Sequence, residues 1–195
     1  MKKYSSANLL EDELSSIGVS DFLNKLLYKL NKNSSVLLNI NIPLNLYLRV
    51  EIFCEDIQDL SEIAFNQNDL MNLLYEDFLL FAKKNPNPKA VFKLLTSLDH
   101  VGGKECSLEP QGESIFKLVH IEQRQSMQKL QIKMKRKLAL RGEVLLADIE
   151  EVQPEHGYTL ERVLELLYID FIDKFRKGDN ETAINNILSL LSDEE

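Results

Sequence analysis

Apolar side chains recur at two different periods along the chain, and these periods separate predicted strands from predicted helices. Over residues 36–42, leucine and isoleucine alternate with Asn39 and Asn41, which predicts a short strand. From about 43 to 65 the apolar residues recur every three or four positions, which predicts a helix. The first part of that segment, 44–52, also alternates, so a longer strand is the alternative.

Three further helical segments are predicted in the first half of the chain. Residues 7–32 read as two short helices broken at Gly18. The next helix is capped by Asn68 and ends at the Asn-Pro-Asn-Pro sequence of 85–88, since the residue before a proline is disfavoured in a helix. A shorter helix is predicted over 89–98.

A polar segment with two adjacent glycines, 99–113, is the best candidate for a domain boundary. It separates a helical part with one strand, 1–98, from a second part, 114–195, although one continuous domain is the alternative. Alternating runs at 114–122 and 129–141 predict a small antiparallel hairpin at the start of the second part.

The chain returns to helix after this hairpin. Thr159 is placed to cap a helix with a wide apolar stripe, and Gly178 is placed to end it. A last helix is predicted over 180–192. No internal repeat is apparent in the sequence, and the predicted fold class is α+β, mostly helical.

The run from Leu130 to Leu140 places lysines on one face of a predicted strand. Lys133, Lys135 and Lys137 occupy alternate positions, about 6.5–7 Å apart on an extended chain. This spacing resembles the ~7 Å between phosphates on an extended nucleic-acid strand. Arg136 interrupts the apolar face, so we expect a bulge or a buried acidic partner there.

Charge is strongly segregated in this acidic chain, whose formal net charge is −8. Residues 117–141 carry eight basic and one acidic side chain, whereas 43–81 carry one basic and eight acidic. Residues 142–195 carry four basic and fourteen acidic side chains. The lysine face therefore has acidic surface in its own chain to pair with, which favours pairing within or between chains over nucleic-acid binding.

The segment 36–81 resembles a ribbon-helix-helix DNA-binding unit. The resemblance implies a strand that pairs with the same strand of a second chain, followed by two helices. It would place Asn39 and Asn41 on the base-reading face, and asparagine suits that role because its amide pairs bidentately with adenine. Pro43 would open the first helix.

The sequence carries no recognisable catalytic residue, metal site or cofactor motif. The histidines and cysteines lack the close spacing of metal ligands; they are His100, His120, His156, Cys54 and Cys106. An acidic cluster at 148–156, which ends in His156, most simply marks a charged helix end and a turn. An enzyme assembled from dispersed residues is an alternative, and we lean against it.

Taken together, these patterns predict a non-catalytic interaction or regulatory protein that self-associates or binds a protein partner. The first alternative is a DNA-binding regulator that uses Asn39 and Asn41 or the lysine strand. No apolar run approaches the roughly 18 residues of a membrane span, and the few cysteines favour a reducing compartment, so we expect a cytoplasmic protein with no membrane partner. The lysine and asparagine bias is typical of AT-rich bacterial or phage genomes.

Overall fold

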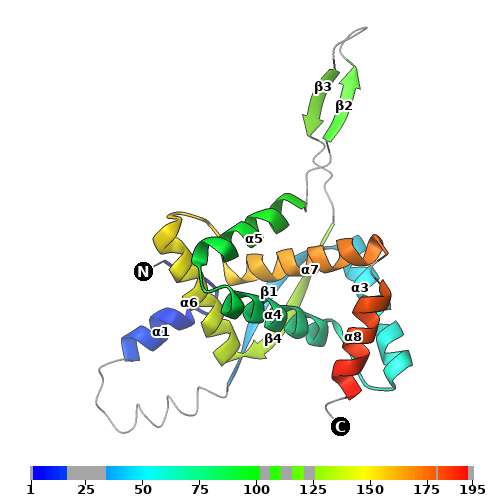
Figure 1. Cartoon of the computed structure of the whole chain (residues 1–195), viewed down its shortest axis with the longest axis horizontal. Coiled ribbons are helices and arrows are strands. Elements are labelled where there is room, and N and C mark those ends of the chain that lie inside the picture. Colours follow the sequence, from blue (N-terminus) through cyan, green and yellow to red (C-terminus); the bar gives the residue numbers. More distant parts are fainter. Residues whose placement is uncertain are drawn as a thin grey trace.

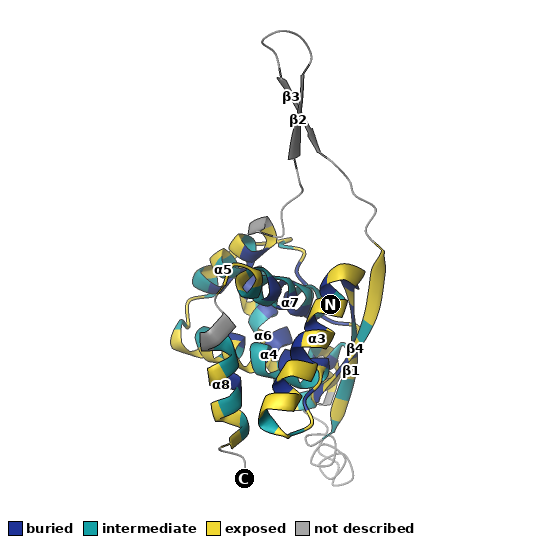
Figure 2. Cartoon of the chain, turned by 90° about the vertical axis from the view of Figure 1, so that its right-hand side faces the viewer, coloured by how far each residue is buried: buried dark blue, intermediate teal, exposed yellow. Residues whose placement is uncertain are grey.

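Two nine-residue strands, β1 (Ser35–Pro43) and β4 (Met127–Lys135), form an antiparallel ribbon (Figure 1), which lies along one side of the molecule in the view of Figure 2. The computed structural model describes residues 2–16, 34–101, 106–110, 116–120, 126–178 and 180–192. The remaining elements in these ranges are α1 (Leu9–Ser16), α3 (Leu44–Ser61), α4 (Gln67–Lys84), α5 (Pro88–Val101), β2 (Cys106–Pro110), β3 (Phe116–His120), α6 (Arg136–Val152), α7 (Leu160–Arg176) and α8 (Asn180–Ser192). The fold is α+β and mostly helical, as predicted.

One face of the ribbon packs on the helices and the other faces solvent (Figure 2). The inward side chains of β1 and β4 alternate with outward ones, and they are Leu38, Ile40, Ile42, Leu130, Ile132 and Met134. These residues meet α4 and α7 in a single core that contains buried residues from both halves of the chain. The alternation seen in the sequence is thus the signature of a half-buried ribbon.

The strands pair differently from the predicted hairpin. β3 pairs with β2, within the segment expected to be a linker, and β4 pairs with β1 from the first half of the chain. The reason lies in the inward apolar side chains of β1. They form a continuous buried surface only when a strand of matching length, with its own inward apolar side chains, lies beside them. β4 is such a strand, since both strands have nine residues and their full lengths are paired.

β4 is shorter than the predicted strand. It ends at Lys135, and α6 begins at Arg136, so Lys137 lies on a helix and not on the strand. The Arg136 amide donates to the Ser34 carbonyl at 2.8 Å, and helix periodicity then begins, with Ala139, Leu146 and Ile149 among the buried residues of α6. The expected acidic partner of Arg136 is present, because its guanidinium lies 3.0 Å from the carboxylate of Glu13.

The predictions for the helices hold, with one corrected cap. α3 is a helix throughout, which excludes the longer strand over 44–52. Asn66, not Asn68, caps α4 in a capping box with Asp69. Thr159 caps α7 by accepting the Arg162 amide, and Gly178, with a φ of 100°, follows its end. Of the two short helices predicted over 7–32, the first is α1, and the second lies outside the described residues.

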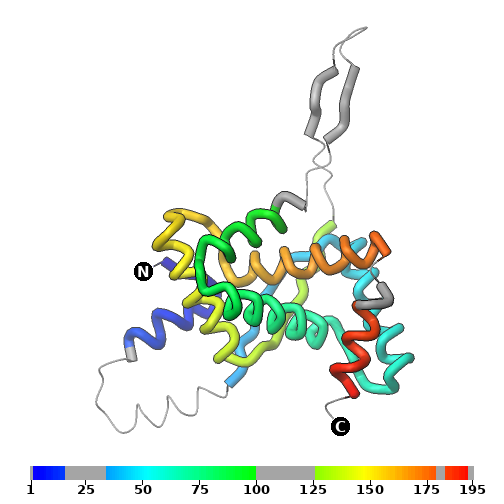
Figure 3. The backbone as a smooth tube through the Cα atoms, in the orientation of Figure 1, coloured from blue at the N-terminus to red at the C-terminus, as the bar shows by residue number. Residues whose placement is uncertain are grey.

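The two halves of the core repeat one arrangement, although no repeat is apparent in the sequence. In each half a nine-residue strand runs directly into a helix of 17 or 18 residues, and a second helix of 17 or 18 residues follows. The register is symmetric about the Asn39–Gln131 pair, and α3 and α6 leave the ribbon at opposite ends (Figure 3). The units β1–α3–α4 and β4–α6–α7 are therefore related by an approximate two-fold axis.

Contacts at equivalent positions support this two-fold relation. The Leu44 amide donates to the Ser126 carbonyl at 2.8 Å, matching the bond from Arg136 to Ser34 at the other end of the ribbon. A fully buried tyrosine occupies the ninth position of the second helix in each unit, Tyr75 in α4 and Tyr168 in α7. Both hydroxyl groups donate across the core, and the pKa of each is raised by burial.

A buried carboxylate anchors the N-terminal segment to this core. Glu143 is fully buried in α6, and its two oxygens accept the Leu9 amide at 3.0 Å and the Leu10 amide at 2.6 Å. The Ser5 hydroxyl also donates to it. A carboxylate at the amino end of α1 satisfies amides that have no partner within the helix and interacts favourably with the helix dipole.

In the described part of the chain, no helix is long and apolar enough to cross a membrane.

Candidate nucleic-acid interface

The outward face of the β1–β4 ribbon brings together most of the site residues predicted from the sequence. Asn39 and Asn41 on β1 share the outward face of the ribbon with Lys133 and Lys135 on β4, so the two segments predicted as alternative DNA-binding sites form one surface. Side chains on one face of neighbouring strands stand about 4.5–5.5 Å apart when they are directly paired. We call this outward surface the ribbon face; it comprises Ser35, Leu37, Asn39, Asn41, Lys129, Gln131, Lys133 and Lys135.

The ribbon face is polar, positively charged and exposed. Its three lysines, Lys129, Lys133 and Lys135, are all exposed, and neither strand contains an acidic residue. None of them forms an ion pair with any residue that the structure describes. Pairing with the chain's own acidic segments, expected from the charge distribution, is therefore not seen among these residues.

Helix side chains hold both edges of the ribbon. At the edge of β4, the Lys133 amide donates to the Asn68 side chain at 2.7 Å, and its carbonyl accepts from the Asn72 amide group at 3.1 Å. At the edge of β1, the Asn41 amide donates to Glu165 of α7 at 2.9 Å. Edge groups of a sheet are otherwise open to pairing with another strand, so these bonds oppose the addition of a third strand at Asn41 and at Lys133.

Asn68 therefore has a role that the sequence pattern did not reveal. It was predicted to cap α4, but its side chain holds the backbone of β4. Asn41 and Lys133 are each the seventh residue of their strand, and Glu165 and Asn72 are each the sixth residue of their helix. These bonds could be recognised from the sequence only by aligning the unit β1–α3–α4 with the unit β4–α6–α7. Most equivalent residues of the two units differ, so the sequence alone does not suggest that alignment.

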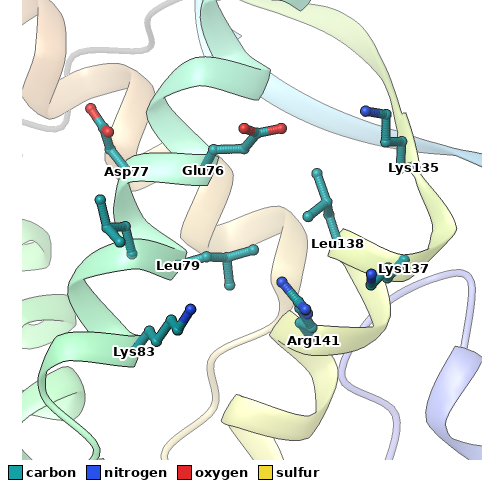
Figure 4. Close-up of a pocket in the computed structure, with 9 residues that line it drawn as sticks. Glu76, Asp77, Leu79, Lys83, Lys135, Lys137, Leu138 and Arg141 are labelled. Carbon is teal, nitrogen blue, oxygen red and sulfur yellow. The ribbon is translucent and has the colours of Figure 1, made fainter.

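Positive charge continues from the end of the ribbon onto α6. A groove of about 490 Å³ lies between α4 and α6, with Lys135, Lys137 and Arg141 on one side (Figure 4). Its other side carries both signs of charge, from Lys83, Glu76 and Asp77. This arrangement offers contacts to an anion at the edge of the ribbon face.

The other candidate chemistry of the sequence is explained by packing. Cys54 is buried, and burial raises the pKa of its thiol to about 12, so it is unreactive at neutral pH. His156 accepts the Tyr158 amide on Nδ1 at 2.9 Å and lies 3.1 Å from Glu150 through Nε2. Glu150 itself is held by Lys2 at 2.6 Å. The described residues contain no group of three potential metal ligands; the side chains of His100, Cys106 and His120 lie outside what is described.

The wide apolar stripe of α7 belongs to the chain's own core. Leu166 and Tyr168 of this stripe are both buried, and α7 packs against the ribbon and against α3, α4 and α5. The stripe therefore does not require a partner chain.

Comparisons of this chain with family models, with curated proteins and with solved structures find no match.

Proposed function

We propose that this protein binds duplex DNA by inserting the β1–β4 ribbon into the major groove. The observation that carries the proposal is a two-stranded ribbon whose exposed face combines amides with three lysines that have no ion-pair partner among the described residues. The major groove of B-DNA is about 12 Å wide and admits a two-stranded ribbon, and base edges there display a pattern unique to each base pair.

Each kind of side chain on the ribbon face has a chemical counterpart in the groove. Asn39, Asn41 and Gln131 carry amides that can pair bidentately with N6 and N7 of adenine. Lysine donates to O6 and N7 of guanine or to phosphate oxygens. Lys137 and Arg141 line a groove on α6 with Lys135 at the ribbon end, and in this proposal they contact the flanking phosphates.

The resemblance of 36–81 to ribbon-helix-helix proteins supports this proposal in a modified form. The resemblance implied that β1 pairs with a second chain, which is wrong for this structure, since β1 pairs with β4 of the same chain. The second strand–helix–helix unit, 127–176, takes the place of that second chain. The geometry expected of a dimer is thereby assembled within one polypeptide.

The net charge of −8 makes the salt concentration important when binding is measured. It does not cancel the local positive charge of the ribbon face. Exposed charges more than about 10 Å apart are largely screened at 0.1 M salt. A phosphate in contact with Lys133 therefore responds mainly to charges close to the ribbon face. These are the lysines of the ribbon together with Asp69 and Glu76, which line a groove with Lys133, and more distant acidic residues contribute little.

Fluorescence anisotropy of a labelled duplex of mixed sequence, at about 50 and 200 mM salt, tests the proposal. Each phosphate contact contributes about 0.9 to the slope of log K against log salt. Replacing Lys129, Lys133 and Lys135 together by glutamine is expected to lower that slope by up to about 3 and to weaken binding at both salt concentrations.

The matched control replaces Lys84, Lys89 and Lys93 by glutamine. These lysines are also exposed, and two of them lie on α5, on the opposite side of the molecule from the ribbon (Figure 2). The control changes net charge equally and is expected to keep the wild-type slope. Equal losses in both triple variants, or no salt-dependent binding by the wild-type protein, would refute binding through the ribbon.

A second candidate function, self-association, is supported by an exposed apolar stripe on α3. Leu44, Leu48 and Ile52 follow one another at four-residue intervals and are 40%, 54% and 58% exposed. Sedimentation velocity tests it: replacing Leu48 and Ile52 by glutamine would dissociate an oligomer formed through this stripe. The control replaces Leu80 and Leu190, which are also exposed but lie on α4 and α8. Binding of another protein partner stays a prediction.

A further inference from the structure

The two halves of the ribbon are equivalent in position and different in chemistry. The two-fold relation makes Leu37 on β1 equivalent to Lys129 on β4, and Asn41 equivalent to Lys133. Only the central pair, Asn39 and Gln131, presents the same functional group from both strands. A ribbon built from two identical chains would carry identical side chains at each of these pairs of positions.

The structure also completes the ribbon without a second copy. Both strands come from one chain, and one position on each edge is bonded to helix side chains, Asn41 to Glu165 and Lys133 to two asparagines. The strand ends are closed by backbone bonds from Leu44 to Ser126 and from Arg136 to Ser34, each 2.8 Å long. Another strand would have to displace these bonds to extend the ribbon.

We infer that a single copy of the chain reads an asymmetric, non-palindromic DNA site. This inference rests on the proposed function and adds the stoichiometry and the kind of site. In homodimeric readers, the symmetry of the protein is mirrored in a palindromic site. Here the reading surface has no such symmetry outside its centre, so the two halves of its site differ.

The chemistry of the ribbon face assigns base preferences to each part of the site. The central amides of Asn39 and Gln131 favour adenine, so the middle of the site is rich in A·T pairs. At one end Lys133 stands opposite Leu37, which is 53% exposed and fits the methyl group of thymine. At the other end Lys129 stands opposite Asn41, a combination that favours guanine beside adenine.

Selection of tight-binding duplexes from a random pool, using the full chain, tests the inference. The expected result is a motif whose two halves differ, with one chain per duplex when the complex is weighed by native mass spectrometry. Changing a preferred base pair in either half is expected to weaken binding about 5- to 150-fold. A palindromic motif bound by two chains would overturn the inference and leave DNA binding through the ribbon intact.

A variant with a symmetrised ribbon face gives a second, independent test. Replacing Leu37 and Asn41 by lysine makes these two positions of β1 match Lys129 and Lys133 of β4, and leaves the Asn41 backbone amide free to keep its bond to Glu165. The motif selected by this variant is expected to become nearly palindromic. An unchanged motif, or binding without base preference in both proteins, would overturn the inference; absence of any DNA binding would remove the proposed function with it.

Discussion

Replacement of Gly142 by alanine tests whether close packing of the two repeated units limits the stability of this fold. Gly142 lies in α6 against Tyr75 of α4, whose hydroxyl donates to the Leu138 carbonyl at 3.1 Å. A Cβ atom at Gly142 would overlap the Tyr75 hydroxyl oxygen and lie 2.9 Å from Cδ1 of Leu160. Tyr75 is fully buried, so its ring has little room to withdraw.

The cost of this substitution has three parts. Inserting a methyl group into a packed core typically costs about 1–3 kcal/mol, and losing the Tyr75 hydrogen bond costs about 1 kcal/mol more. Alanine has a higher helix propensity than glycine, which raises the free energy of unfolding by about 1 kcal/mol. The free energy of unfolding is therefore expected to fall by roughly 1–3 kcal/mol, whereas helix propensity alone predicts a gain.

Urea unfolding followed by far-UV circular dichroism measures this change, and a double-mutant cycle assigns its cause. Tyr75→Phe alone removes the hydroxyl and is expected to cost about 1 kcal/mol. In the Tyr75→Phe background, Gly142→Ala no longer overlaps an oxygen atom and keeps only the close contact with Leu160, so it is expected to cost less than in the wild-type protein. Additive effects of the two substitutions, or a Gly142→Ala protein as stable as the wild type, would refute this account of the packing.

Three further predictions concern the residues that hold the fold together. Glu143→Ala leaves buried donors of residues 2–16 without an acceptor and is expected to lower the free energy of unfolding by about 3 kcal/mol. Amide hydrogen exchange should become faster in that segment, and unchanged exchange would contradict the anchoring role. Burial lowers the pKa of His156. The contribution of the neutral imidazole to stability is therefore complete above pH ~6.5 and is lost as the pH falls through the lowered pKa. His156→Gln should remove this loss of stability at low pH, as measured by urea unfolding. Asn66→Ala removes the capping box of α4 and should lower the free energy of unfolding by about 1 kcal/mol, whereas no change in the urea midpoint would argue against it.

Local elements were predictable because each depends on neighbours in the sequence. The periodicity of 43–65 placed α3 within a few residues, and Thr159 and Gly178 marked the ends of α7. The alternation at 36–42 identified not only β1 but also its outward asparagines. These features follow from apolar periodicity and from the backbone preferences of single residues, both of which are visible in one sequence.

Pairing of β1 with β4 was not predictable by the same means. The two strands are separated by three helices and two further strands. The alternation of apolar residues predicts that each segment is a strand, but it does not indicate which other strand it pairs with. The end of β4 was missed because Leu138 and Leu140 continue the alternation by chance after the helix has begun. The repeat was hidden because equivalent positions, such as Leu37 and Lys129, hold unlike residues, and only a few, such as Tyr75 and Tyr168, are kept.

The covalent connection between the two strand–helix–helix units changes how the ribbon responds to dilution. An interface between separate subunits is lost when the protein concentration falls below the dissociation constant of the dimer. Here the second strand is tethered to the first, and its effective concentration is set by the length of the intervening chain and not by how many molecules are present. The ribbon therefore persists in a cell that holds only a few copies of the protein, and its formation is a first-order step of folding.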